Sequence, residues 1–566
     1  MSSRSSDVLI ADIARRCPSS AVSRSRRTHT WQAIEYQIEA AAGELISAGP
    51  LTRPPQVRIP LGVDGWHKMY LGLWVCGRSD TGWGRSTMGD ERVGGLRIRL
   101  SKDSTFVTVR REEPSRESIE ETYLKAADLT HQQLVVEPPS GGFRGQSSLA
   151  FVRLEPMSEP EVRTLAEDLH KHEHKRLCAT NDSFGMYFRD LAATESEIRS
   201  YVEPYRDTDF SMLLWEVVSG MVGGWTPSLP LYADGVEDYP RVGDRNMWQA
   251  LRKLSANGVN PIQVAIDHAH SFGLELHISI RAEMFQAAPP FEEVFSTPFY
   301  RAHPELQLVD RDGAKVTGLS YAYPEVRAHQ IRMLCDAVSL GADGVAVIFP
   351  RSGPYVLYEE PFLQDFIQRH GVDPREFPEA DPRIHAAWAE TMTQFMRELR
   401  TAVRGDRVER HAGGRTVSAI VFATPTENTR FGLDPAAWIA EGLVDRLMVY
   451  PCLADHSHHE IDVEYYHDLT HGKSCSLYYN LMPRHMCAHR YRALAKHYYH
   501  HGADGLLLWD TYQRHDFTSQ WNVIRTLGHR GSLLEDDRLQ PDGPRLHKLL
   551  RIGTHNLGRF SPYRGA

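Results

Sequence analysis

The feature that most constrains the fold is a repeated alternation of short apolar segments with helical segments. Eight apolar segments of strand length occur between residues 175 and 510, and a helical stretch separates most of them. Near-continuous apolar strands that alternate with helices predict a parallel sheet covered by helices. Eight such units are the number that closes a (β/α)8 barrel, so we predict an α/β protein built on a TIM barrel. The predicted strands are 175–182, 210–216, 274–283, 344–350, 417–425, 444–451, 474–480 and 505–510.

The tetrapeptide Gly-Ala-Asp-Gly precedes two of these segments, at 341–344 and at 502–505. We interpret each copy as the turn between a helix and the next strand, because Gly341 and Gly502 accept the left-handed conformation that ends many helices. The strands that follow are the fourth and the eighth, half a barrel apart. Chance recurrence of a common turn is the alternative interpretation.

The amino-terminal part of the chain has a different pattern. Residues 1–30 are rich in Ser and Arg and are predicted to form a poorly ordered tail. Trp31, Ile34, Ile38 and later apolar residues have helical spacing, and Gly49-Pro50 would end this helix. From residue 56 to about 157, short apolar segments separated by Gly, Pro, Asp and Ser predict an antiparallel β-sandwich of the jelly-roll type. The predicted domains are a tail (1–30), a helix plus β-sandwich (31–160), a catalytic barrel (165–530) and a C-terminal extension (531–566).

Composition excludes several classes of partner. The formal net charge of −9 disfavours nucleic acid, and no apolar stretch approaches the roughly 20 residues of a membrane helix. The chain begins without a recognisable signal peptide, and its seven cysteines have no CxxC spacing. We therefore expect a cytoplasmic protein with no membrane partner, although a non-standard export route is compatible with the sequence. Assembly into a homo-oligomer is left open.

Chemistry in such barrels takes place at the carboxyl ends of the strands. Carboxylates, tyrosines and tryptophans gather there, which is typical of a carbohydrate site, because sugars stack on aromatic rings and bond to carboxylates and amides. Cleavage of a glycosidic bond needs two carboxyl groups, one of them a general acid. The side chains at or just after the strand ends include Asn181, Asp182, Glu216, Arg281, Glu283, Arg351, Tyr358, Glu359, Glu360, Glu427, Asn428, Tyr450, Asp455, Asn480, Trp509 and Asp510.

Several segments resemble the family-10-like glycosyl hydrolases, a group within the TIM-barrel glycosidases. The similarity is carried by "HPELQLVDRDGAKVTGLSYAYPEVRAHQIRML" (303–334), "GPYVLYEEP" and "TENTRFGLD" in the barrel. "LGVDGWHKMYLGLW" and "AFVRLEPMS" are similar to the amino-terminal β-domain of that group. The resemblance spans roughly residues 56–530 and implies a class of enzyme, the glycoside hydrolases, more than a particular reaction. We predict cleavage of an oligo- or polysaccharide and expect no cofactor and no metal.

The resemblance also suggests where the catalytic pair lies. Retaining barrel glycosidases place the nucleophile after strand seven, but "SLYYNLMPRH" has no carboxylate there. The amylase-like arrangement uses the ends of strands four and five, so we predict Glu427 as the general acid and Glu359 as the nucleophile or base. Asp510 is predicted to assist catalysis by holding sugar hydroxyls or by tuning the pKa of the acid. The predicted substrate-binding residues are Glu216, Glu283, Arg351, Tyr358, Glu360, Asn428, Tyr450, Asn480 and Trp509.

Other interpretations of the same residues remain open. A carboxylate at a strand end often caps a helix or pairs with Arg, Glu360 fits an exposed first helical turn, and Trp509 could pack beneath the helices. "DHSHHE" (455–460) permits a rival metal-dependent lyase, isomerase or hydrolase that uses Asp455 and His456. "KHYYHHG" (496–502) is predicted to lie on the surface of a helix at the opposite barrel end. A second rival is a sugar-binding barrel without catalytic activity.

Overall fold

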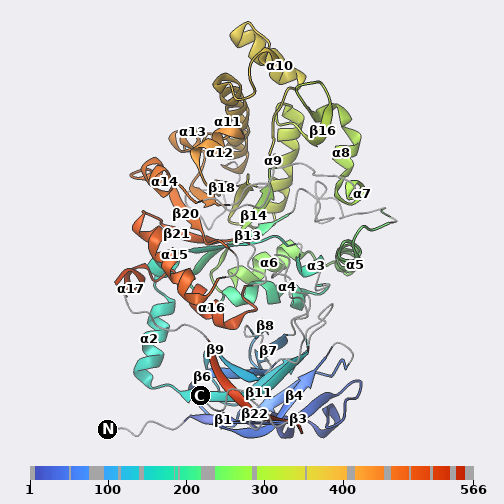
Figure 1. Ribbon diagram of the computed structural model, residues 1–566, viewed down its shortest axis with the longest axis vertical. Coiled ribbons are helices and arrows are strands. Elements are labelled where there is room, and N and C mark those ends of the chain that lie inside the picture. The colour runs from blue at the N-terminus through green and yellow to red at the C-terminus, as the bar shows by residue number, and fades with distance from the viewer. Residues whose placement is uncertain are drawn as a thin grey trace, which may run out of the picture.

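A closed barrel of eight parallel strands forms the centre of the molecule (Figure 1). The computed structural model describes residues 7–49, 52–74, 95–111, 117–138, 146–183, 185–188, 192–217, 236, 238–282, 290–350, 353–404, 415–451, 460–483, 486–509, 514–535 and 544–554. Each barrel strand lies within a predicted segment or begins one residue before it, so the predicted fold is confirmed. In order around the barrel the strands are β12 (Leu177–Asn181), β13 (Phe210–Glu216), β14 (Glu275–Arg281), β17 (Gly344–Ile348), β18 (Thr416–Phe422), β19 (Arg446–Tyr450), β20 (Ser476–Asn480) and β21 (Gly505–Leu508).

The two Gly-Ala-Asp-Gly copies are turns that lead into β17 and β21, as predicted. Gly341 and Gly502 have φ angles of 110° and 80°, in the region that favours glycine. The aspartates bind the neighbouring strand: a carboxylate oxygen of Asp343 accepts the Leu276 N–H at 2.8 Å, and one of Asp504 accepts the Leu477 N–H at 2.8 Å. Each turn therefore satisfies a backbone donor at the start of the adjacent strand and helps set the register of the barrel.

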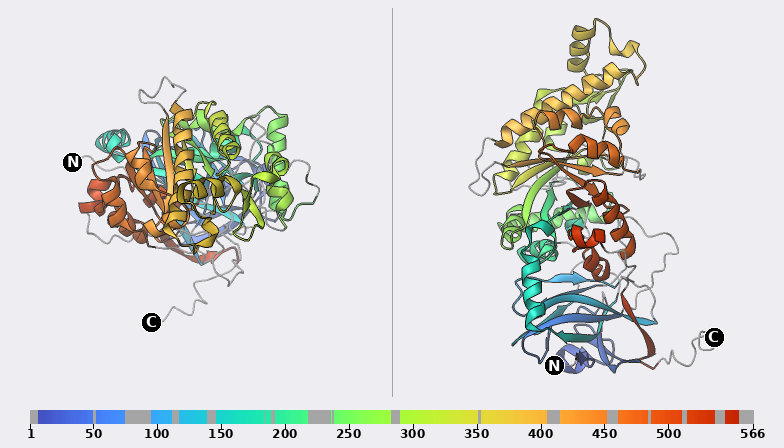
Figure 2. Two further views of the ribbon diagram at one scale, coloured as in Figure 1. Left: turned by 90° about the horizontal axis from the view of Figure 1, so that it is seen from above. Right: turned by 90° about the vertical axis from the view of Figure 1, so that its left-hand side faces the viewer.

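Helices surround the barrel and bury its outer face (Figures 1 and 2). One continuous cluster of buried apolar side chains joins the outward-facing strand positions to these helices. A short hairpin, β15 (Gln307–Val309) with β16 (Lys315–Leu319), lies between β14 and the helix α9. The helices are α3 (Gly185–Phe188), α4 (Glu195–Val202), α5 (Val242–Ala256), α6 (Pro261–His270), α7 (Glu292–Phe295), α8 (Pro298–Ala302), α9 (Pro324–Val338), α10 (Glu360–His370), α11 (Pro382–Arg404), α12 (Pro425–Arg430), α13 (Pro435–Ala440), α14 (Val463–Thr470), α15 (Ala488–His500), α16 (Thr518–Ile524) and α17 (Arg530–Glu535).

Two antiparallel sheets form a β-sandwich next to the barrel, at the lower end of Figure 1. Apolar side chains of both sheets share one buried core. The smaller sheet has the order β5 (Val57–Pro60), β10 (Gln133–Glu137), β7 (Leu96–Leu100) and β8 (Val107–Val109). The larger sheet has the order β1 (Val8–Ile10), β11 (Ser147–Pro156), β4 (Ala42–Ala48), β3 (Trp31–Ile38), β22 (Arg545–Ile552), β9 (Ser118–Asp128) and β6 (Trp66–Trp74), with β2 (Val22–Ser23) beside β3.

The helix expected over residues 31–49 is wrong, because this segment forms the antiparallel strands β3 and β4. Trp31, Ala33, Tyr36 and Ile38 are buried while residues between them are more exposed, which is largely strand alternation. The expectation of a poorly ordered tail also fails for residues 7–30, which contain β1, β2 and the helix α1 (Ile13–Arg16). The C-terminal extension returns to the sandwich as β22, between β3 and β9.

Buried polar contacts join the sandwich to the barrel. Arg110, just after β8, forms an ion pair of 3.0 Å with Asp516, and both side chains are almost fully buried. Ser519 of α16 donates a hydrogen bond of 2.9 Å to Glu120 of β9. The helix α2 (Glu159–Leu169) makes the covalent connection between the two units. Across the described ranges, no helix combines the length and the apolar character needed to cross a membrane.

We predict that Gly502→Ala lowers the free energy of unfolding more than Gly472→Ala does. Both glycines have φ angles near +75°, at 80° and 72°, so each alanine carries a backbone penalty of about 1–2 kcal/mol. Only at Gly502 would the added Cβ also meet a side chain, 2.1 Å from His467 Nδ1, whereas nothing lies within 4 Å at Gly472. Chemical denaturation of both variants measures the difference, and equal losses would show that His467 moves aside without cost.

Candidate active site

Strand alternation separates the inner from the outer side chains of the barrel. A second apolar cluster, distinct from the helix-facing one, fills the barrel interior. On β13 its members are Met212 and Leu214, so Glu216, the next residue of the same parity, also faces inward at the carboxyl end of the strand. The same alternation places Arg281 of β14 and Asn480 of β20 on the inner face. The carboxyl end of the barrel, which we call the mouth, is therefore lined by polar side chains from several strands.

An ion pair between Glu216 and Arg281 is the main charged contact at the mouth. Arg281 Nε lies 2.7 Å from Glu216 Oε1; the Glu216 side chain has no exposed surface, and that of Arg281 is 19% exposed. A buried carboxylate is costly unless it is paired, and a guanidinium at this distance stabilises its charged form. The pair thus holds a negative charge inside the mouth, with the arginine on its solvent side.

The end of β12 lies directly beside Glu216. Asn181, the last residue of β12, pairs in register with Trp215, and Asp182 follows it directly in the chain. The Ser183 hydroxyl donates a hydrogen bond to the Glu216 carbonyl, and the Ser183 N–H donates to Asn181 Oδ1 at 2.8 Å. Asp182 is partly exposed, and its Oδ1 accepts the Gly185 N–H at 3.4 Å. Asp182 and Glu216 therefore stand at the carboxyl ends of two adjacent barrel strands.

Aromatic and amide groups complete the inner surface. Tyr450 at the end of β19 stacks on Trp509, just after β21, with ring centroids 4.5 Å apart and an interplanar angle of 28°. Both rings belong to the interior cluster, so the alternative that Trp509 packs beneath the helices is wrong. Asn480 is fully buried, and within the described part of the chain neither its amide nitrogen nor its amide oxygen makes a hydrogen bond. An unpaired buried amide is rare, and it suits a site that binds a polar ligand.

Glu359, the predicted nucleophile or base, has a different environment. Its side chain is fully buried at the start of α10, where Oε1 accepts the Val309 N–H at 2.9 Å. Oε2 accepts Ser320 Oγ at 2.8 Å and the Leu357 N–H at 3.0 Å. Burial raises the pKa of this carboxyl, while the three hydrogen bonds oppose that rise. Because both oxygens hold the β15–β16 hairpin and the loop before α10, the geometry weighs against a direct role in bond cleavage.

Glu427, the predicted general acid, lies after β18 but caps a helix. Its Oε2 accepts the Thr424 N–H at 3.2 Å and the Thr424 hydroxyl at 3.1 Å, while the Glu427 N–H donates back to that hydroxyl. This reciprocal pair is a capping box at the start of α12. Asn428 is buried, with Oδ1 accepting the Phe422 N–H and Nδ2 donating to the Tyr466 hydroxyl. These hydrogen bonds of Glu427 and Asn428 stabilise the loop that follows β18.

Two further predicted substrate-binding residues lie on or beside α10. Tyr358 is buried against Phe362 and Trp388, with both ring pairs edge to face. Glu360 is exposed in the first turn of α10 and accepts a hydrogen bond from Gln364 at 2.8 Å, as the solvated-turn interpretation expected. Neither residue belongs to a barrel strand, whereas Glu216 and Asn480 occupy inward-facing positions of β13 and β20.

Three predicted residues, Asp510, Glu283 and Arg351, lie outside the described residues. The same holds for Asp455 and His456, on which the rival metal-dependent reaction depends. His497 and His500 of the second histidine-rich segment are on α15, where His500 is exposed, which confirms its predicted surface position.

Sequence reasoning selected Glu216, Tyr450, Asn480 and Trp509, which the structure brings to one inner surface. It noted Arg281 and Asp182 at strand ends but gave them no role, because a strand-end position does not reveal that Arg281 pairs with Glu216. Arg514 was missed entirely. It is almost fully buried and donates to the Leu481 carbonyl, just after β20, at 3.4 Å. Its position five residues beyond Trp509 follows no strand pattern.

No family model matches the chain, and no curated protein matches it. Solved structures with similar architecture include alpha-L-fucosidase isoenzyme 2 from Paenibacillus thiaminolyticus, at 10% identity and a TM-score of 0.38, covering 63% of this chain and 49% of that one. A cycloisomaltooligosaccharide glucanotransferase from a Paenibacillus species has 13% identity and a TM-score of 0.34, covering 78% and 51%. The chain spans about half the length of these two proteins. The alpha-galactosidase TtGalA from Thermus thermophilus has 12% identity and a TM-score of 0.32, covering 93% and 99%. Likeness at this level identifies neither a substrate nor a catalytic residue.

We predict that Glu359→Gln destabilises the protein by about 1–3 kcal/mol, because an amide NH2 would face an N–H or O–H donor in a buried site. The neighbouring Glu360→Gln is the matched control, and as an exposed change it should stay within about 0.5 kcal/mol of the parent. Urea denaturation monitored by circular dichroism measures both. A loss of less than about 0.5 kcal/mol for Glu359→Gln, within the control range, would contradict the structural role of this carboxylate.

Proposed function

We propose that this protein is an enzyme, a glycoside hydrolase that cleaves an oligo- or polysaccharide at the mouth of its barrel. The observation that carries the proposal is the buried Glu216 carboxylate, ion-paired with Arg281 on the inner face of the carboxyl end of the strands. In barrels of this architecture that end is where chemistry takes place. The residue types around the pair are those that bind a sugar and stabilise positive charge on it.

Glu216 is the better candidate for the ionised partner of the catalytic pair. Arg281 favours its anionic form, and an anion beside the reacting carbon stabilises an oxocarbenium-like transition state. In this proposal Glu216 acts as the nucleophile, or as the base that activates water. Glu359 and Glu427 have no part in the proposed reaction, because their carboxylates hold a hairpin and cap a helix.

The general acid is proposed to be Asp182, which directly follows β12, the neighbour of the strand that ends at Glu216. Its partial exposure leaves it accessible to a proton and to the leaving group. In the sequence, Glu283 follows β14 and Asp510 follows β21. These two residues are the alternative candidates for the general acid. Tyr450 and Trp509 would form the apolar floor below the sugar, and the unpaired amide of Asn480 would bind a hydroxyl.

The proposal predicts that Glu216→Gln lowers kcat by about 10³-fold or more while the protein stays folded, because the isosteric amide removes the charge needed in the transition state. A panel of aryl glycosides and polysaccharides first identifies a substrate, and the anomeric configuration of the product, read by NMR, separates retention from inversion. The exposed Glu360→Gln serves as the control and should turn over normally. Unchanged turnover of Glu216→Gln would remove this residue from the mechanism.

The role of Asp182 is tested by the leaving group. Asp182→Asn should lose most activity on a native glycoside, whose leaving group needs a proton, and should keep it on an activated dinitrophenyl glycoside, which does not. The same comparison with Glu283→Gln and Asp510→Asn shows whether one of these residues is the acid instead. Tight sugar binding without cleavage of any substrate would favour the sugar-binding rival and contradict the enzyme.

A further inference from the structure

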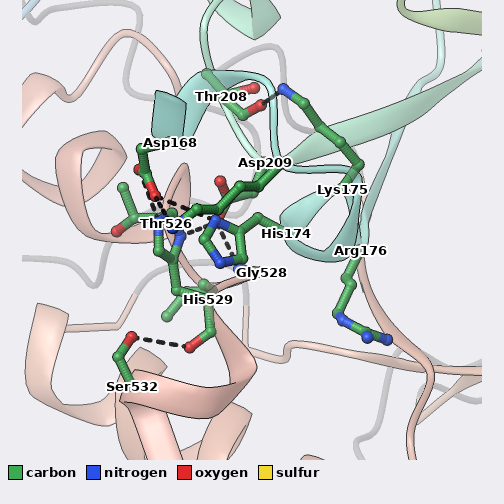
Figure 3. A network of polar contacts seen from close by, with 12 residues as sticks. Asp168, His174, Lys175, Arg176, Thr208, Asp209, Thr526, Gly528, His529 and Ser532 are labelled. Atoms are coloured by element: carbon green, nitrogen blue, oxygen red, sulfur yellow. Dashed lines mark hydrogen bonds and ion pairs between the residues drawn. The ribbon is translucent and has the colours of Figure 1, made fainter. Parts of the chain in front are cut away.

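A compact His/Asp cluster lies where the chain passes from the sandwich into the barrel (Figure 3). Asp168 comes from the last turn of α2, and His174 from the short 3-10 helix η2 (His172–His174). His529 comes from the turn between α16 and α17. Asp209, which contacts His529, directly precedes β13 and so lies at the amino-terminal end of the barrel, opposite the mouth. The cluster is thus separate from the proposed active site and does not depend on the proposed function.

The side chains of Asp168, His174 and His529 converge on one point. One ligand atom from each of these three residues lies within 4.8 Å of the other two. Asp168 Oδ1 is 3.3 Å from His174 Nδ1, and Asp168 Oδ2 is 2.9 Å from His529 Nε2. The two imidazole rings face each other at a tilt, with centroids 3.8 Å apart and an interplanar angle of 31°. Imidazole nitrogens and a carboxylate at these separations suit a divalent ion such as Zn²⁺, whose bonds to N and O are about 2.0–2.2 Å long.

Asp209 contacts the other ring nitrogen of His529, the one that does not face Asp168. Its Oδ2 lies 2.7 Å from His529 Nδ1 and also accepts the Gly528 N–H at 2.8 Å. A metal-binding histidine usually donates its other ring N–H to a carboxylate, which orients the ring and fixes the tautomer. With the proton on Nδ1, the lone pair of His529 Nε2 points toward the Asp168 carboxylate. Two acceptors in contact repel each other unless a proton or a cation lies between them.

A single proton can join only one of the two histidines to Asp168. A proton on His529 Nε2 would bridge this nitrogen to Asp168 Oδ2, which lies 2.9 Å away. His174 Nδ1 is buried and makes no hydrogen bond to any described residue, although Asp168 is near. A cation between the three side chains would satisfy both histidines and the carboxylate together.

The backbone at Gly528 lies close to both His174 and Asp209. A Cβ on Gly528 would lie 2.0 Å from the His174 carbonyl oxygen and 2.7 Å from the Asp209 Cβ, so only glycine fits. Lys175, next to His174, directs its amino group away from the cluster to the Thr208 carbonyl (Figure 3). Lys171 is the nearer cation, 3.9 Å from Asp168 Oδ1, and it is half exposed.

We propose that Asp168, His174 and His529 bind one Zn²⁺ that fastens the segment after α2 to the turn before α17, with Asp209 orienting His529. Three protein ligands leave one tetrahedral position to solvent. The site would tie the connection between the sandwich and the barrel to the end of the barrel sequence. Because metal binds only the folded arrangement, it should stabilise the protein.

Zinc binding to the full chain, prepared without a histidine tag and stripped with chelator, tests the proposal. Calorimetric titration and elemental analysis should show that the parent binds about one more Zn²⁺ than His174→Gln or His529→Gln. Excess Zn²⁺ should raise the Tm of the parent and leave that of both variants unchanged. Mg²⁺, which prefers oxygen ligands, should give no site of this kind.

His172→Gln is the matched control, because His172 is exposed in the same segment and lies two residues from His174. It should keep the zinc stoichiometry and the rise in Tm. Zinc uptake by His174→Gln equal to that of the parent would overturn the proposal, as would a parent that binds no Zn²⁺; the cluster would then be an ion-pair network with a protonated His529. Should His529→Gln fail to fold, the parent, His174→Gln and His172→Gln still decide the question.

Discussion

Closure of the parallel sheet by hydrogen bonds between β21 and β12 is the constraint on which the rest of the structure depends. Leu506 and Leu507 of the last strand pair in register with Leu177 and Cys178 of the first. Without this pairing the sheet would have two edges, and its strand ends would lie along a line. With it, the same ends form a ring, so that Glu216 and Trp509, from strands far apart in sequence, face one interior.

Burial of carboxylates distinguishes two kinds of acidic residue in this barrel. Glu359, at the start of α10, and Glu216, at the end of β13, are both fully buried. Glu359 receives three hydrogen bonds from the protein, which fix a hairpin and a loop. Glu216 instead faces the barrel interior and forms an ion pair with Arg281. The environment, not the residue type, separates a structural carboxylate from a candidate catalytic one.

The errors of the sequence interpretation have a physical origin. Residues 31–48 satisfy helical spacing at Trp31, Ile34 and Ile38, yet they form a hairpin, because pairing with β22 and packing on the sandwich favour strand alternation. Local periodicity is a weak preference when a large sheet offers hydrogen-bond partners. The choice of Glu359 and Glu427 as the catalytic pair stays a prediction. Both residues follow strand ends, but Glu359 supports a hairpin and Glu427 caps a helix.

What the sequence determined by itself is the architecture. Apolar segments of strand length can be buried on both faces only within a helix-covered parallel sheet, and eight of them predict a barrel; the Gly-Ala-Asp-Gly turns before β17 and β21 follow from the same logic. Only the tertiary structure decided which side chains are neighbours: the pairing of Glu216 with Arg281, the stacking of Tyr450 on Trp509, and the cluster of Asp168, His174 and His529. These contacts depend on the register between strands and on the packing of loops, which distant parts of the chain set together and which no local pattern encodes.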